Sequence, residues 1–331
     1  MNSTRLVVVS DIHYAGAAER ARIGFEHRAV PDLPTRLLLR AYRKFVWLEE
    51  PTAHAHMLDT FLGRAGEPDL VVANGDFSCD SAFVGVSDDA ARASAAECLA
   101  KLRGRFGARF AATIGDHELG KTSLAGNRGG MRLASWHHAV GELGLEPLWT
   151  REAGRHVLIG LTSTLIGLPV FQRDMLEAEL AGWQRLREEH LDAVRRVFDS
   201  VPRDRRIILF CHDPTALPFL HDEPAVRSRL PQFEQTIIGH MHSEFFMWQS
   251  RVLAGMPVVG FCGKSIRRYS VALNRARLWR PFRVKLCPSL TGIQLFKDGG
   301  FLEAELPPRD GDPVKFRLHR LPWTQPGARA G

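Results

Sequence analysis

The segment LVVVSDIH at residues 6–13 decides the fold of this chain. Its first four residues are apolar and three are β-branched, which is typical of a short strand covered on both faces. The run ends at Ser10, and Asp11 and His13 follow it two positions apart. In extended backbone, side chains at i and i+2 point to the same side, so this pair can hold one ion. The segment predicts a buried strand whose carboxyl end carries chemistry.

The same arrangement recurs along the chain. Asn74-Gly75-Asp76 and Gly115-Asp116-His117-Glu118 each follow an apolar run, and so do His212 and Gly239-His240-Met241-His242. In an open α/β sheet the carboxyl ends of the strands form the ligand crevice, so these side chains are expected to meet. The apolar runs predict strands at residues 69–73, 110–114, 156–161, 207–211, 236–238 and 258–261.

The segments between these runs include helices. Apolar residues recur at helical spacing over residues 178–198, and residues 90–102 are rich in alanine. Residues 293–306 read as a hairpin around a turn at 297–300. Strands that alternate with helices, followed by a strand-rich end, predict a layered α/β domain built on two packed sheets.

Composition excludes several classes of protein. The 331 residues are 45% hydrophobic, which rules out a disordered chain. No stretch reaches the roughly 18 apolar residues of a membrane span, and the apolar run near the start is too short for a signal peptide. Five scattered cysteines with no CxxC pair exclude a zinc ribbon and favour reduced thiols. We therefore expect a cytoplasmic protein.

The donors after the strands point to metal. Carboxylate oxygens and imidazoles together suit divalent Mn, Fe or Zn. Glycines at 75, 115 and 239 permit sharp turns and close backbone approach beside the donors. One DxH or GHxH alone is weak, but five such elements after apolar strands are hard to obtain by chance. The pattern indicates a dinuclear site.

The order DxH, GD, GDHE, His and GHxH resembles the calcineurin-like metallophosphoesterase family, over roughly residues 5–245. The resemblance implies a four-layer α/β/β/α sandwich of two mixed sheets. It also implies a phosphoester hydrolase with two divalent ions, preferably Mn, with Fe or Zn as alternatives. We expect one domain over residues 1–322, with an insertion at about 19–62, a basic strand-rich part at about 262–322, and a frayed tail at 323–331.

The resemblance assigns roles residue by residue. One metal would be held by Asp11, His13 and His242, the other by Asp116, His212 and His240, and Asp76 would bridge both. A hydroxide between the ions would be the nucleophile. His117 would act beside it as general acid or as a phosphate-binding cation.

One position departs from the family, which has Asn where this chain has Asp116. A third carboxylate should bind metal more tightly and repel an anionic substrate. Asn127, downstream in the same loop, is an alternative ligand. Asn74 and Arg128 are secondary candidates for substrate contact.

Two basic stretches suggest partners. Residues 35–48 place Arg36, Arg40, Arg43 and Lys44 on one helical face and apolar residues on the other. This pattern fits a helix packed on its own domain, an interfacial membrane helix or a lid over a lipid substrate. Residues 264–285 hold eight Lys or Arg and no acid, with three aromatic residues interleaved. These basic stretches could bind an anionic lipid surface or a nucleotide, and nucleic acid is a less favoured partner.

The preferred function is a dinuclear metal-dependent phosphoester hydrolase acting on a phosphorylated small molecule or a lipid-linked substrate. Within the superfamily, a UDP-2,3-diacylglucosamine-type pyrophosphatase and a nucleotide phosphodiesterase remain alternatives. From another class, the chain could be a metal-binding scaffold without catalysis. We expect it in the cytoplasm, with peripheral contact at the inner membrane face as one option.

Overall fold

Two five-stranded mixed sheets form the centre of the molecule. The structure is a computed structural model that describes residues 3–261, 264–308 and 313–323. The strand orders are β10-β9-β1-β2-β3 and β4-β5-β6-β7-β8, and in each sheet the strands that precede the predicted donors run parallel. The strands are β1 Thr4–Val9, β2 Leu70–Asn74, β3 Phe110–Thr113, β4 Leu148–Ala153, β5 His156–Leu161, β6 Arg206–Cys211, β7 Phe233–Ile238, β8 Val284–Leu286, β9 Gly300–Leu306 and β10 Phe316–Arg320.

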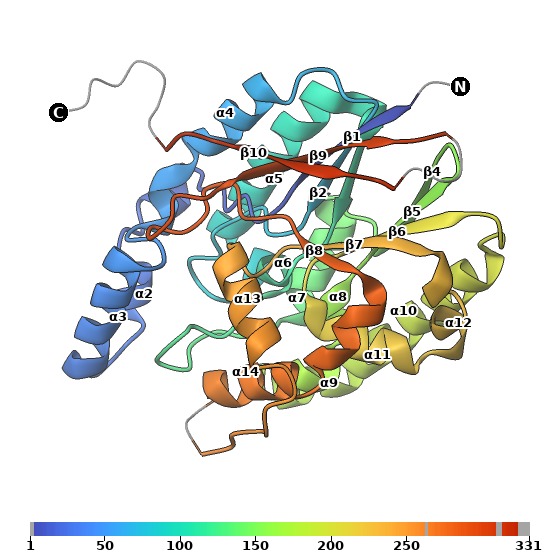
Figure 1. The fold of residues 1–331 in the computed structure, drawn as a ribbon. Coiled ribbons are helices and arrows are strands. Elements are labelled where there is room, and N and C mark those ends of the chain that lie inside the picture. The colour runs from blue at the N-terminus through green and yellow to red at the C-terminus, as the bar shows by residue number, and fades with distance from the viewer. Residues whose placement is uncertain (1–2, 262–263, 309–312, 324–331) are drawn as a thin grey trace.

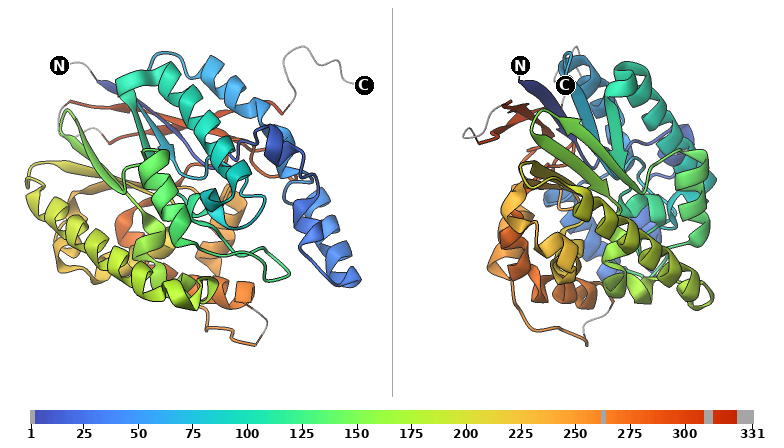
Figure 2. Two further views of the ribbon diagram at one scale, coloured as in Figure 1. Left: turned by 180° about the vertical axis from the view of Figure 1, so that it is seen from behind. Right: turned by 90° about the vertical axis from the view of Figure 1, so that its right-hand side faces the viewer.

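Alternate residues of β1 pack in two different hydrophobic cores. Leu6 and Val8 face the second sheet, in a cluster with Ile208 of β6. Val7 and Val9 face outward and pack in another cluster that includes Phe61. A third cluster lies on the outer side of the second sheet. Helices therefore cover both sheets from outside, and the predicted four-layer α/β/β/α sandwich is confirmed (Figures 1 and 2).

Two long helices dominate the outer layers. α5 spans Asp89–Phe106 beside the first sheet, and α10 spans Leu180–Ser200 beside the second, close to the predicted ranges (Figure 1). The shorter helices are α1 Ala17–Arg20, α2 Phe25–Arg28, α3 Leu33–Phe45, α4 His56–Arg64, α6 Asp116–Leu119, α7 Leu133–His137, α8 Ser163–Ile166, α9 Leu168–Phe171, α11 Leu217–Asp222, α12 Pro224–Arg227, α13 Glu244–Val252 and α14 Lys264–Asn274.

Two strand predictions near the C-terminus are wrong. Residues 258–261 form no strand, and Val258 and Phe261 are exposed. Residues 293–299 form no strand either: a turn covers 294–296, and the Asp298 carboxylate accepts the backbone N–H of Ile293. The observed hairpin joins β9 to β10 instead, and β9 also pairs with β1.

The insertion after β1 divides into two parts. α4 belongs to the outer helical layer, since Met57, Leu58 and Phe61 are buried there. α3 extends away from the body of the molecule (Figure 1). The predicted basic face of α3 is not continuous, because Arg43 is buried in an ion pair with Glu26.

The C-terminal basic stretch is mostly structural. Trp279 and Phe282 are buried in the core, so they cannot stack on bases, and Arg275 pairs with Asp222. Trp323 donates its indole N–H to the backbone oxygen of Thr291, while the rest of the predicted tail lies outside the described residues. Across the described ranges, no helix is long and apolar enough to cross a membrane.

Candidate active site

The carboxyl ends of strands from both sheets meet at one place. The Asp11 amide donates to the Gly75 carbonyl, which joins the loops after β1 and β2. Across the sheets, the His240 amide donates to Asp11 Oδ1 at 3.0 Å. The Glu118 carboxylate accepts the amides of Asp76 and Gly115, which fixes the loop after β2 against the loop after β3. The crevice predicted at the strand ends is therefore formed by both sheets together.

The seven predicted metal donors are brought together in this crevice. Around the first position, His13 Nε2 lies 3.0 Å from His242 Nε2, and His242 Nε2 lies 3.3 Å from Asp11 Oδ1. Around the second, Asp116 Oδ1 lies 2.9 Å from His240 Nδ1 and 3.2 Å from His212 Nε2. Each trio has one ligand atom per residue within 4.8 Å of the others.

Asp76 lies between the two trios. Its Oδ2 is 3.2 Å from His212 Nε2 and 3.9 Å from His13 Nε2, so the oxygen faces an imidazole from each side. Although this oxygen is buried, it has no hydrogen bond of acceptable geometry among the described residues. An anionic oxygen surrounded by imidazole nitrogens, without hydrogen bonds to them, is the arrangement that a shared cation would satisfy.

The backbone at the donors is strained. Asp11, His13, Asp76, His240 and His242 all have φ between 46° and 63°. Residues with a Cβ rarely adopt this left-handed region, and such strain concentrates at functional sites. The strained backbone of these loops therefore directs the donor side chains into the crevice.

Gly239 allows the loop after β7 to approach the loop after β1. A Cβ at this position would lie 2.1 Å from Ser10 Oγ and 2.4 Å from Asp11 Oδ2. Those distances are shorter than real Cβ contacts, so a larger residue here would displace the Ser10 hydroxyl and the Asp11 carboxylate from the donor cluster. The sequence prediction of close backbone approach holds at this residue.

The charges of the cluster fit divalent cations. Three buried carboxylates, Asp11, Asp76 and Asp116, share one crevice. Burial opposes charge on the histidines, yet Asp116 and Asp213 raise the pKa of His240 to about 9. Likewise, Asp76 and Asp11 raise the pKa of His212 well above its usual range in spite of burial. The cluster attracts positive charge, and oxygen with imidazole donors suits Mn, Fe or Zn.

His117 lies beside the donors and faces the pocket. Its Nδ1 is 3.1 Å from the Cys79 carbonyl, which orients the ring, and its buried Nε2 has no hydrogen-bond partner among the described residues. Burial, and to a lesser degree Lys121, lowers the pKa of His117 well below the usual imidazole range. The ring therefore places Nε2 at the edge of the cluster, 3.9 Å from Asp76 Oδ2, and with His13 and Asp76 it forms a further group that could contact an ion.

Two charged residues of the site were missed by sequence reasoning. Lys121 Nζ lies 3.7 Å from Asp116 Oδ2, and Asp213 Oδ2 lies 3.8 Å from His240 Nε2. Both line the pocket. Asp213 directly follows His212, and Lys121 follows the GDHE motif by three residues, so position in the motif was the available signal.

The secondary candidates lie elsewhere. The Asn74 amide bonds to the Ile237 carbonyl and accepts from the Thr113 hydroxyl, so it holds the two sheets together and is not free for substrate. Arg128 and Asn127 are exposed and do not line the pocket. Asp116 is in the donor cluster, so the alternative ligand Asn127 is not needed.

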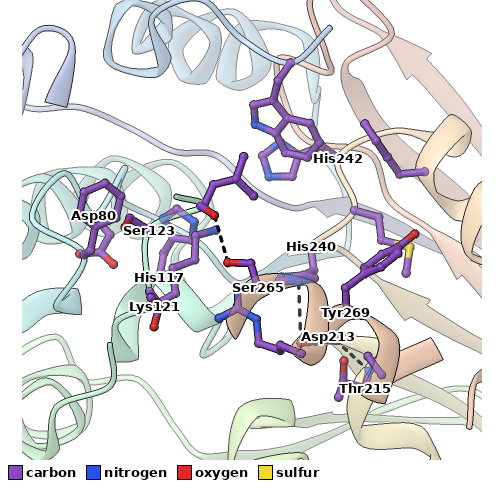
Figure 3. A pocket seen from close by; sticks show the side chains of 18 of the residues that line it. Asp80, His117, Lys121, Ser123, Asp213, Thr215, His240, His242, Ser265 and Tyr269 are labelled. Atoms are coloured by element: carbon purple, nitrogen blue, oxygen red, sulfur yellow. Dashed lines mark hydrogen bonds and ion pairs between the residues drawn. The ribbon is translucent and has the colours of Figure 1, made fainter. Parts of the chain in front are cut away.

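A pocket of about 460 Å³ opens on the donor cluster (Figure 3). His13, His117, His240 and His242 form part of its wall. The remaining wall is largely aromatic and aliphatic, and its aromatic residues include Phe25, Tyr42, Trp47, Phe83, Phe246 and Tyr269.

The chain matches a known protein family in sequence and several solved structures in fold. The profile of the calcineurin-like phosphoesterase family matches residues 4–244. No curated protein matches the chain in sequence. Among solved structures, the chain is similar to a dimetal phosphatase from Danio rerio (13% identity, 92% of this chain and 93% of that chain, TM-score 0.46). It is also similar to a phosphopantetheinyl hydrolase from Mycobacterium tuberculosis (15% identity, 73% and 84%, TM-score 0.33) and a purple acid phosphatase from yellow lupin, Lupinus luteus (12% identity, 72% and 38%, TM-score 0.34).

Proposed function

The chain belongs to the calcineurin-like phosphoesterase family and is a metal-dependent phosphoesterase, and we propose that its substrate is a phosphoester with an apolar group next to the phosphate. The observation that carries the proposal is the aromatic and aliphatic wall of the pocket that adjoins the donors. Burying apolar surface stabilises a bound ligand by about 25 cal/mol per Å².

The donors would hold two divalent ions. Asp11, His13 and His242 form one set, Asp116, His212 and His240 form the other, and Asp76 lies between them. When bound, such ions supply a hydroxide nucleophile at neutral pH and polarise the phosphoryl oxygens. We propose Mn for this role, with Fe or Zn as alternatives, because the donor set mixes carboxylates and imidazoles.

The remaining polar residues act on the substrate itself. His117 presents Nε2 toward the pocket, and although burial lowers its pKa, the negative charge of a bound phosphate favours the protonated ring, so that Nε2 is placed to deliver a proton to the leaving oxygen. Lys121 lies beside the donors with its ammonium group in the pocket wall, where it can bind a phosphoryl oxygen. Asp213 lies near the far side of the His240 ring and can keep that ring oriented.

The small number of unpaired cationic side chains in the pocket wall favours an amphiphilic substrate over a nucleotide. Of the three Lys or Arg residues that line the described pocket, Arg43 is paired with Glu26 and Arg268 with Asp174. Only Lys121 adjoins the donor cluster, which leaves little cationic surface for a polyphosphate chain. A lipid-linked phosphate or pyrophosphate therefore fits this wall better.

Alkyl phosphates of increasing chain length test the substrate class. We expect kcat/KM with Mn to rise from methyl to hexyl phosphate, by up to roughly fourfold for each CH₂ group that becomes buried. Phe246→Ser should remove most of this rise, whereas Phe245→Ser, its exposed neighbour on α13, should not. A rate that does not depend on chain length would exclude an apolar subsite.

A further inference from the structure

The apolar side of α3 faces solvent. Leu37, Leu38 and Phe45 are 54%, 72% and 64% exposed, whereas the buried side holds Leu39 and Arg43. An amphipathic helix of a soluble domain usually buries its apolar stripe, so this orientation is reversed. A concentrated apolar face left in water marks an interaction surface.

Basic residues border this apolar face. Arg40 and Lys44 are exposed on α3, and with Arg28 and Arg36 they give a basic excess to a groove of about 930 Å³ that Glu49 and Glu50 also line. Arg36 is held by the Val30 carbonyl, whereas Arg40 and Lys44 have no carboxylate partner in the part of the chain that the structure describes. Their charge is complementary to an anionic surface.

The other side of the helical segment belongs to the active-site pocket. Tyr42 and Trp47 line that pocket, so α3 separates it from the exposed apolar face. Across the pocket, Leu124, Ile266 and Tyr269 also line it and remain 52%, 48% and 41% exposed. Apolar surface is therefore present on the outside of α3 and at the edge of the pocket.

We propose that α3 docks the protein on an anionic membrane surface. Leu37, Leu38 and Phe45 insert at the boundary between headgroups and acyl chains, while Arg40 and Lys44 contact lipid phosphates. With the protein held at the membrane, the exposed apolar residues Leu124, Ile266 and Tyr269 at the edge of the pocket offer a path by which an amphiphilic phosphoester can enter. The entry of substrate rests on the proposed function, but membrane binding does not.

Vesicle co-sedimentation of the full chain tests the proposal. We expect binding to vesicles of 70% phosphatidylcholine and 30% phosphatidylglycerol and little binding to pure phosphatidylcholine. The variants Leu37→Ser with Phe45→Ser, and Arg40→Glu with Lys44→Glu, should each lower the partition coefficient by roughly tenfold or more. Hydrolysis of p-nitrophenyl phosphate, which needs no membrane, should not change.

Matched controls use exposed residues on other elements. Leu318→Ser on β10 and Arg64→Glu on α4 should bind vesicles like the wild type. Wild-type protein that ignores anionic vesicles, or controls that lose binding equally, would overturn the proposal. So would a solution dimer, seen by sedimentation velocity, that Leu37→Ser with Phe45→Ser converts to monomer. An enzyme that binds vesicles but hydrolyses no phosphoester would contradict the proposed substrate and not the docking surface.

Discussion

At the scale of single residues, Asp116 is where this site departs from its family, and Lys121 lies next to it. A third carboxylate in the crevice should repel an anionic substrate. The Lys121 ammonium, 3.7 Å from Asp116 Oδ2, offsets part of that charge and stays within the pocket wall. Asp116 and Lys121 therefore form a charge pair at the position where the family resemblance implies a neutral Asn.

Variants of the pair should separate metal binding from anion binding. Asp116→Asn should keep activity, raise the Mn concentration required, and strengthen inhibition by inorganic phosphate. Lys121→Met should weaken phosphate inhibition by roughly tenfold or more with little change in metal content. The measurements are activity against Mn concentration, phosphate inhibition and Mn titration calorimetry. Lys315→Met, at an exposed site, is the control, and unchanged phosphate inhibition in both variants would refute the pairing.

His117→Ala should lower turnover far more than metal content, by about 10²–10⁴-fold if Nε2 delivers the proton to the leaving oxygen. The loss should be smaller for p-nitrophenyl phosphate, whose leaving group needs no proton, than for an alkyl phosphate. Steady-state kinetics on both substrates, with metal analysis of the same samples, measure this. Equal losses on the two substrates would assign His117 to phosphate binding instead.

At the scale of elements, the strands that lead to donors and the buried strand β5 were predictable, whereas the edge strands of the sheets mostly were not. The runs that became β1, β2, β3, β6 and β7 are apolar and end in glycine, carboxylate or imidazole. β4 and β10 are edge strands with charged residues, and β8 has three residues, so tertiary pairing decides their conformation.

The conformation of the donor loops was also beyond sequence reasoning. Asp11, His13 and His240 adopt positive φ; Asp and His do so more often than most residues with a Cβ, but the sequence does not tell which of them will. The orientation of α3 was missed for a related reason. Its amphipathic pattern was visible, but a pattern does not say which side faces the protein.

Gly239→Ala should damage the donor cluster, because the new Cβ would meet Ser10 Oγ and Asp11 Oδ2 at 2.1 and 2.4 Å. We expect weaker Mn binding by calorimetry and a lower melting temperature. Gly104→Ala on α5 is the control, since nothing lies within 4 Å of its Cβ position, and it should stabilise slightly. If Gly239→Ala binds Mn like the wild type, the two loops do not approach as closely as described.

His190 on α10 should make stability depend on pH. Its Nε2 accepts the Thr162 amide, and burial lowers the pKa of His190 to about 4. The neutral ring stabilises the fold above the unfolded pKa of about 6.5, and that stability is lost as pH falls below it. At pH 5 the loss should be about 2 kcal/mol.

Urea unfolding in EDTA at pH 7.5 and pH 5 measures this effect without competition from metal. The wild type should lose more stability than His190→Gln, which cannot titrate. Equal losses in the two proteins would mean that His190 is solvated or protonated in the fold.

At the scale of the whole molecule, two sheets contribute to one site and neither contains it alone. Asp11, Asp76 and Asp116 come from the first sheet, and His212 and His240 from the second. The loop contacts between sheets, such as the His240 amide on Asp11, are therefore part of the chemistry as well as the fold. Filling the site with metal should stabilise the packing of the two sheets.

The metal content of the purified protein tests the dinuclear centre most directly. It is measured by inductively coupled plasma mass spectrometry before and after Mn addition. We expect about two ions per chain in the wild type, as the two donor trios imply, and a melting temperature that rises with Mn. Asp76→Ala should lose both ions or nearly so, because its oxygen lies between the trios. A wild-type protein that stays free of metal in excess Mn would contradict the dinuclear centre, and with it the proposed nucleophile.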